Sequence, residues 1–236
     1  DGYGGLEHRN STALICNRAD LPRLDDPKQS DGYTTLLGLI SHEYFHTWWV
    51  KRAKPATFLN YQLATEQYTS QLWLYEGFTS YYDDLALIRA AVVTLPQYLD
   101  TLSKTISRVS RAPSNRRQSL IESSFTAWTK FYQQDENAIN SVVSYYGKGC
   151  LVALCVDARL RADGLSLDGL MRNCYPLFSS NGSSEQAFFD QLLSYSQSVL
   201  SVSAASVMGL ISAMIYLFLV PMMVFFLLKD KELLMS

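Results

Sequence analysis

The stretch that decides the fold reads Ser41-His42-Glu43-Tyr44-Phe45-His46-Thr47-Trp48. It holds two histidines four residues apart, and a glutamate directly follows the first of them. Apolar residues recur at helical spacing through and before it, at Leu36, Leu37, Ile40, Tyr44 and Trp48. This spacing predicts a helix over residues 34–50, and its apolar and aromatic flanks predict that the helix is buried. Residues four apart on a helix lie one above the other, so the two imidazoles share a face.

Two histidines on one helical face can bind a single zinc ion, and H-E-x-x-H is a pattern typical of zinc peptidases. We predict His42 and His46 as zinc ligands, with Glu43 one step round the helix and able to take a proton from a water. The alternative is two surface histidines near a structural glutamate. The chain has only three histidines and two lie here. On a buried helix they would be costly without a partner, so we favour the zinc site.

A catalytic zinc site needs a third protein ligand and an open position. Two glutamates downstream are candidates, Glu66 and Glu76. Glu66 lies in a polar run, which favours a surface carboxylate. Glu76 lies among large apolar residues in Leu72-Trp-Leu-Tyr-Glu-Gly-Phe78, and a carboxylate buried there needs a cation. The sequence therefore predicts one zinc ion per chain, bound by His42, His46 and Glu76.

The remaining pattern predicts an α+β fold that is mainly α-helical. One or two short strands are expected within residues 1–20, and the prolines and aspartates of residues 21–32 indicate a loop. Helical periodicity and breakers predict further helices over three ranges: 70–93, 96–109 and 144–161.

The segment His42-Glu-Tyr-Phe-His-Thr-Trp48, followed by Leu72-Trp-Leu-Tyr-Glu-Gly-Phe-Thr-Ser-Tyr-Tyr82, resembles the gluzincin metallopeptidases. Within them it is most similar to the glycyl aminopeptidase family, a relative of the aminopeptidase N family. The resemblance covers about residues 1–190 and implies part of a thermolysin-like zinc peptidase catalytic domain, with Glu76 as third zinc ligand. Trp49 stands where the family usually carries a smaller polar residue, and we expect it to narrow or reshape the cleft.

Two further segments fit the resemblance. Tyr3-Gly-Gly-Leu-Glu-His8 is similar to the G-x-M-E-N edge strand of the aminopeptidase N family, with Leu and His in place of Met and Asn. It implies that Glu7 binds the free amino group of the substrate. Tyr145-Tyr-Gly-Lys-Gly149 is similar to the Y-x-K-G segment whose tyrosine stabilises the oxyanion. The register implies Tyr146, with the neighbouring Tyr145 as the alternative.

The implied function is zinc-dependent hydrolysis of peptide bonds, with Glu43 moving protons and Tyr146 donating to the oxyanion. The resemblance implies an aminopeptidase that releases small amino-terminal residues, glycine or alanine; an endopeptidase on the same zinc site is a close variant. Each zinc-bound histidine should donate its second ring N–H to an acceptor, for which Asp83 is one candidate. The net charge of -2 gives no reason to expect a nucleic-acid partner.

The tail has a different composition. Residues 191–228 contain no charged side chain, and residues 204–228 are apolar and long enough to cross a hydrocarbon core of about 30 Å. Residues 217–232 resemble a segment of the autoinducer-2 exporter-like permeases. We therefore predict two parts, a peptidase domain at 1–190 and a membrane-type segment at 195–236. The chain would be membrane-associated if the segment belongs to the natural protein, and otherwise soluble in the cytoplasm or periplasm.

Two alternatives concern the whole chain. One is a piece of a transporter that contains H-E-x-x-H by chance, but one membrane-length segment cannot form a transport path. The other is an incomplete, inactive peptidase fragment fused to a permease segment. The first residue is Asp1 rather than Met, and Asp1-Gly-Tyr-Gly-Gly resembles the middle of a domain, so we expect a fragment. The sequence predicts no oligomeric state.

Overall fold

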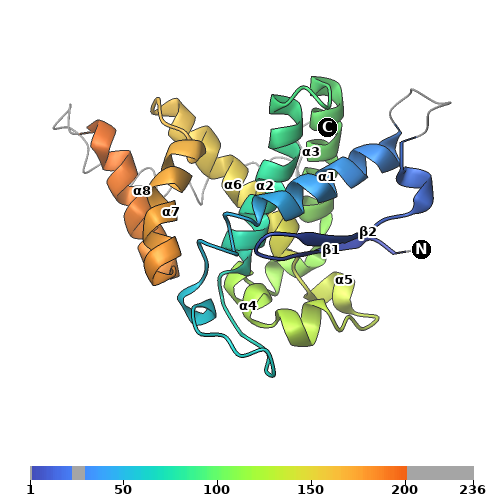
Figure 1. Ribbon diagram of the computed structural model, residues 1–236, viewed down its shortest axis with the longest axis horizontal. Coiled ribbons are helices and arrows are strands. Elements are labelled where there is room, and N and C mark those ends of the chain that lie inside the picture. Colours follow the sequence, from blue (N-terminus) through green and yellow to red (C-terminus); the bar gives the residue numbers. More distant parts are fainter. Residues whose placement is uncertain (1, 23–29, 201–236) are drawn as a thin grey trace, which may run out of the picture.

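The structure is a computed structural model that describes residues 2–22 and 30–200, with side chains described up to residue 197. A short β-hairpin comes first, and the rest of the described chain is mostly helical (Figure 1). The predicted α+β, mainly helical class is confirmed. The elements are β1 (Gly4–Glu7), β2 (Thr12–Ile15), α1 (Asp31–Phe45), α2 (Leu72–Arg89), α3 (Leu95–Arg111), α4 (Leu120–Phe125), α5 (Ala138–Ser141), α6 (Tyr145–Ala162), α7 (Leu167–Asn181) and α8 (Glu185–Leu200).

Strands β1 and β2 form an antiparallel pair in which Gly4 faces Ile15 and Glu7 faces Thr12. The pair contacts α1 and runs beside it (Figure 1). Much of the apolar surface of the hairpin is exposed to solvent: Leu6 is 59% and Ile15 is 62% exposed. Few contacts therefore hold the hairpin to the helices.

Helix α1 begins at Asp31, where the Ser30 side chain accepts a hydrogen bond from the backbone N–H of Tyr33. It ends at Phe45, five residues before the predicted end. The chain turns there: the backbone N–H of Lys51 donates to the carbonyl of His46, and that of Val50 donates to the carbonyl of Ala53. These bonds close a loop instead of continuing the helix.

The prediction that α1 is buried is only partly correct. Leu36, Leu39 and Glu43 form its buried face. Tyr44 is 65% exposed, and Ile40 and Trp48 are also exposed. Apolar residues therefore occupy two sides of the helix, and only one side packs against the described part of the chain.

Helices α2 and α6 are in direct backbone contact. A Cβ atom on Gly77 would lie 2.5 Å from Cα of Gly149, and a Cβ on Gly149 would lie 2.5 Å from the carbonyl oxygen of Trp73. Both positions therefore require glycine. A Cβ on Gly77 would also lie 3.0 Å from the carbonyl oxygen of Tyr145, so this contact places the first turn of α6 beside the part of α2 that carries Glu76.

The core lies between α2, α6 and the helices at one end of the molecule, α7 and α8 (Figure 1). Trp49 belongs to it. Its side chain is 1% exposed, donates through Nε1 to the carbonyl of Leu74 at 3.1 Å, and packs on the rings of Tyr75 and Phe178. The expectation that Trp49 reshapes a cleft is therefore wrong, because its ring is taken up by core packing.

Among the described residues, one stretch is long and apolar enough to cross a membrane, Ala138–Ala162. It contains α6, whose buried Ala153 and Leu160 belong to the core, so core packing accounts for its composition. The predicted boundary between residues 190 and 195 falls within α8. The predicted membrane segment, 204–228, lies outside the described residues.

Candidate active site

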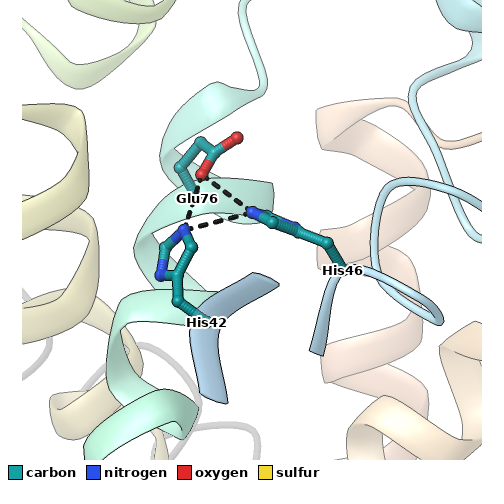
Figure 2. A group of neighbouring side chains, drawn as sticks. All are labelled: His42, His46 and Glu76. Carbon is teal, nitrogen blue, oxygen red and sulfur yellow. Dashed lines mark hydrogen bonds and ion pairs between the residues drawn. The ribbon is translucent and has the colours of Figure 1, made fainter. Parts of the chain in front are cut away.

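Three side chains from two helices converge on one point (Figure 2). His42 lies in the last turn of α1, and His46 is the residue directly after the helix. Glu76 lies in the second turn of α2. Nε2 of His42 lies 3.1 Å from Nε2 of His46, and Oε2 of Glu76 lies 3.2 Å and 3.1 Å from these two nitrogens. All three side chains are largely buried. His46 is 1% exposed.

The other ring nitrogen of each histidine has an acceptor. Nδ1 of His42 lies 2.9 Å from Oδ2 of Asp83, and Nδ1 of His46 lies 2.8 Å from the carbonyl oxygen of Trp49. A carboxylate and a carbonyl only accept, so each Nδ1 carries the proton. In the neutral imidazoles, Nε2 then presents a lone pair toward the common point.

This donor set fits a zinc ion. Nε2 of His42, Nε2 of His46 and Oε2 of Glu76 lie 3.1–3.2 Å from one another, so one cation could contact all three atoms. Tetrahedral zinc with bonds of about 2.0–2.1 Å separates its ligand atoms by about 3.3 Å, and two histidines with one glutamate are a known catalytic ligand set. In the described part of the chain, this is the group of three whose ligand atoms lie within 4.8 Å of one another. Glu66 is exposed and outside it.

The charges around the donors are strongly coupled. Burial would lower the pKa of His42, but its bonds to Asp83 and Glu76 and their charges raise the pKa to about 10. Burial also opposes ionisation of Glu76, yet His46 and His42 hold its pKa well below the usual range. The attraction between the two imidazoles and the Glu76 carboxylate contributes to both shifts. A bound metal ion would take the place of the imidazole charge beside Glu76.

Glu43 is buried beside this group, with 7% of its surface exposed. Its Oε2 atom has no hydrogen-bond partner within the described residues. Burial, opposed by the charges of His42 and His46, raises its pKa. Strand β1 passes so close that a Cβ on Gly5 would lie 2.1 Å from Oε1 of Glu43. The site thus holds an unpaired carboxylate oxygen beside the candidate metal ligands, and Gly5 leaves room for the Glu43 side chain.

Three tyrosines meet on the α6 side of the site. The ring of Tyr146 lies 6.0 Å from that of His42, between centroids. The hydroxyl of Tyr145 donates to the hydroxyl of Tyr132 at 3.4 Å, and that of Tyr132 lies 3.1 Å from the hydroxyl of Tyr146. Burial and the nearby Glu76 charge raise the pKa of Tyr146, so its hydroxyl stays protonated.

Glu7 lies at the end of β1, on the strand side of the site. Its charge is close enough to Glu43 and His46 to raise the pKa of both. Oε1 of Glu7 accepts from Nζ of Lys51 at 2.9 Å. The structure therefore gathers Glu7 with the other predicted site residues, but it already gives Glu7 a cation.

Several site features had no signal in the sequence. The acceptor for His46 is a backbone carbonyl, that of Trp49, and any residue could supply it. Tyr132 and Lys51 lie outside the segments that carry the resemblance. Asp83, by contrast, follows Glu76 by two helical turns, and this spacing already indicated it.

The family model described as M61 glycyl aminopeptidase matches residues 35–152, which is half of the chain. The match includes both histidines, Glu76 and the start of α6. The chain belongs to the M61 glycyl aminopeptidase family. The expected resemblance is confirmed.

The fold is similar to the crystal structure of an aminopeptidase N family protein from Idiomarina loihiensis, with 50% sequence identity and a TM-score of 0.76. The similarity covers 79% of this chain but 32% of that one.

The chain is also 55% identical over 42 residues to the putative permease PerM of Escherichia coli (strain K12). These 42 residues make up 18% of this chain and 12% of PerM. The predicted resemblance to permeases is thus confirmed. The chain spans about an eighth of that permease and about a third of the aminopeptidase N family protein.

Proposed function

We propose that residues 1–190 form the catalytic part of a zinc-dependent aminopeptidase that releases small amino-terminal residues, glycine or alanine. The observation that carries the proposal is the convergence of three potential ligand atoms, from His42, His46 and Glu76, within 3.2 Å of one another. Membership of a peptidase family and the likeness to an aminopeptidase N family protein support the reaction class.

Glu43 is the proton carrier in this proposal. A zinc ion at the three ligands would acidify a water and polarise the peptide carbonyl. The free Oε2 of Glu43 has no partner to release before it accepts the proton of the attacking water. Burial raises the pKa of Glu43, which makes its carboxylate a better proton acceptor than an exposed glutamate. The protonated carboxyl then passes its proton to the leaving amine.

Tyr146 donates to the oxyanion. Tyr145 donates to Tyr132, which leaves the hydroxyl hydrogen of Tyr132 free to be donated to Tyr146. The hydrogen of Tyr146 is then available to the substrate. Hydrogen bonds in such a chain polarise one another and strengthen the final donor.

Glu7 binds the substrate's free amino group, and this would make the enzyme an exopeptidase. The glycine and alanine preference comes from family membership. An endopeptidase is the close variant, since the same zinc group could act on internal bonds if Glu7 did not select the terminus.

The experiment compares the wild type with Glu43→Gln for zinc content and for hydrolysis of glycyl and alanyl peptides. The variant should bind zinc as the wild type does, and its rate should fall by roughly 10²- to 10⁴-fold because the proton carrier is lost. An unchanged rate would remove Glu43 from the proposal. Zinc binding without hydrolysis by the wild type would favour the inactive fragment.

A second comparison tests the terminus. Peptides with a free amino group should be cleaved and acetylated ones should not. Equal cleavage of both would favour the endopeptidase.

A further inference from the structure

Lys51 is bound to the carboxylate that the proposed function reserves for the substrate. Its Nζ atom lies 2.9 Å from Oε1 of Glu7, and the side chains are 29% and 20% exposed. An ion pair between partly buried groups is screened less than one on the open surface. An incoming ammonium group must therefore share Glu7 with Lys51 or displace it.

The loop that carries Lys51 is held by its backbone. The N–H of Lys51 donates to the carbonyl of His46 at 3.1 Å. Val50, which precedes it, has φ of 112°, a conformation that a β-branched residue rarely adopts. Val50 is 8% exposed, and its N–H donates to Ala53 at 2.7 Å. Packing and these bonds thus stabilise a strained turn from which the side chain of the next residue reaches Glu7.

Further cations lie around this pair. The pKa of Lys54 is lowered by burial together with the charges of Lys51 and Arg9. Lys54 has no ion pair with any residue in the described ranges 2–22 and 30–197. The pair between Lys51 and Glu7 therefore lies within a group of cations that includes Lys54 and Arg9.

We propose that Lys51 is a specificity-determining residue that competes with the amino group of the substrate for Glu7. This rests on the proposed role of Glu7 as the amine site. When a substrate with a free amino terminus binds, Lys51 gives up its contact with Oε1. When the terminus is blocked, Lys51 keeps Glu7 paired, so the blocked peptide leaves no unpaired carboxylate. Lys51 therefore weakens the preference for free amino termini.

Binding of two small probes tests this without turnover. Glycinamide carries the free amine, and N-acetylglycinamide lacks it. Their affinities for the zinc-loaded 236-residue chain would be measured by NMR titration for the wild type and for Lys51→Met. The variant should bind glycinamide about two- to fivefold more tightly, the range expected when a partly exposed ion pair no longer competes. Its affinity for N-acetylglycinamide should be equal or lower.

Lys54→Met is the matched control, since it removes a nearby lysine that does not contact Glu7, and it should change glycinamide affinity less than Lys51→Met does. Lys51→Arg keeps the cation and should behave as the wild type. In Glu7→Gln the effect of Lys51→Met should disappear, because the two residues act through one contact.

The outcomes separate this proposal from the proposed function. If Glu7→Gln leaves the ratio of the two affinities unchanged, Glu7 is not the amine site, and both the aminopeptidase assignment and the competition by Lys51 are refuted. If Glu7→Gln lowers the ratio while Lys51→Met leaves it unchanged or weakens glycinamide binding, the amine site stands and competition by Lys51 is refuted. Loss of zinc binding in Lys51→Met, with zinc binding retained in Lys51→Arg, would also refute competition by Lys51. The lysine would then be needed to hold the structure of the site.

Discussion

The helix side and the strand side of the site are built differently. On the helix side, His42, His46 and Glu76 project from α1 and α2, and each histidine is fixed by an acceptor behind it. On the strand side, Glu7 projects from a two-stranded hairpin whose residues are mostly exposed. Its partner, Lys51, is a flexible side chain at the end of a loop.

The two sides differ in how firmly their side chains are positioned. On the helix side, Glu76 is positioned by the core, because α2 packs directly against α6 at Gly77 and Gly149. The strand side depends on a few contacts, chiefly β1 against α1 and the Glu7–Lys51 pair. We therefore expect changes on the helix side to act on the metal and the rate, and changes at Glu7 and Lys51 on the strand side to act on substrate choice.

The largest effect is expected for Glu76→Gln, which removes a charged ligand atom from the group of three. Zinc affinity should fall by more than the roughly 10- to 100-fold that is typical when only a partner of a ligand is lost. Glu66→Gln is the matched control and should leave zinc content unchanged, because Glu66 is exposed and outside the group. Zinc content measured after dialysis decides between them. The opposite result would transfer the third ligand to Glu66.

Tyr146→Phe comes next. It should keep zinc and lower the hydrolysis rate by roughly 10²- to 10³-fold, the usual loss for one oxyanion donor. Tyr145→Phe should lower the rate less, since the Tyr145 hydroxyl donates to Tyr132 rather than to the oxyanion. Steady-state rates at equal zinc content provide the measurement. A larger loss for Tyr145→Phe would shift the assignment by one residue.

Gly5→Ala tests how loosely the strand side is held. The new methyl group would lie 2.1 Å from Oε1 of Glu43, so the carboxylate or the hairpin must move. If Glu43 moves, the rate should fall by up to about 100-fold with zinc retained, because small displacements of a proton carrier are costly. Gly4→Ala is the control, since its Cβ would meet nothing within 4 Å. An unchanged rate in Gly5→Ala would mean that the hairpin yields instead.

Asp83→Asn is expected to have the smallest effect. The amide can still accept from His42, but it lacks the charge that supports the imidazole. Zinc affinity should fall by roughly 10- to 100-fold, as is usual for such partners. Asp84→Asn, at the neighbouring carboxylate, should have less effect on zinc because no hydrogen bond joins Asp84 to His42 in the described structure. Competition with a metal-sensitive dye measures both.

Local pattern was enough to predict much of the helix side. The i, i+4 spacing of His42 and His46 determines their common face, and the apolar setting of Glu76 indicated a buried carboxylate. The helices over 72–89, 95–111 and 145–162 also agree closely with the predicted ranges. These features depend on residues close together in sequence, so the spacing of apolar residues was enough to predict them.

The end of α1 and the exposure of its second apolar side could not be predicted in this way. The strained turn at Val50 is stabilised by packing and by bonds that form only in the folded chain. For the same reason, the position of Trp49 in the core depended on Phe178, more than a hundred residues away.

The sequence alone was enough to predict the candidate site residues, because the spacing of His42, Glu43 and His46 and the setting of Glu76 are local. Only the tertiary structure decided what faces them. The carbonyl of Trp49 behind His46, Tyr132 beside Tyr146, and Lys51 on Glu7 all arise from chain turns and helix contacts. The last two contacts join segments that are distant in sequence, and the first depends on the direction of a backbone carbonyl that any residue could supply, so no sequence pattern predicts them.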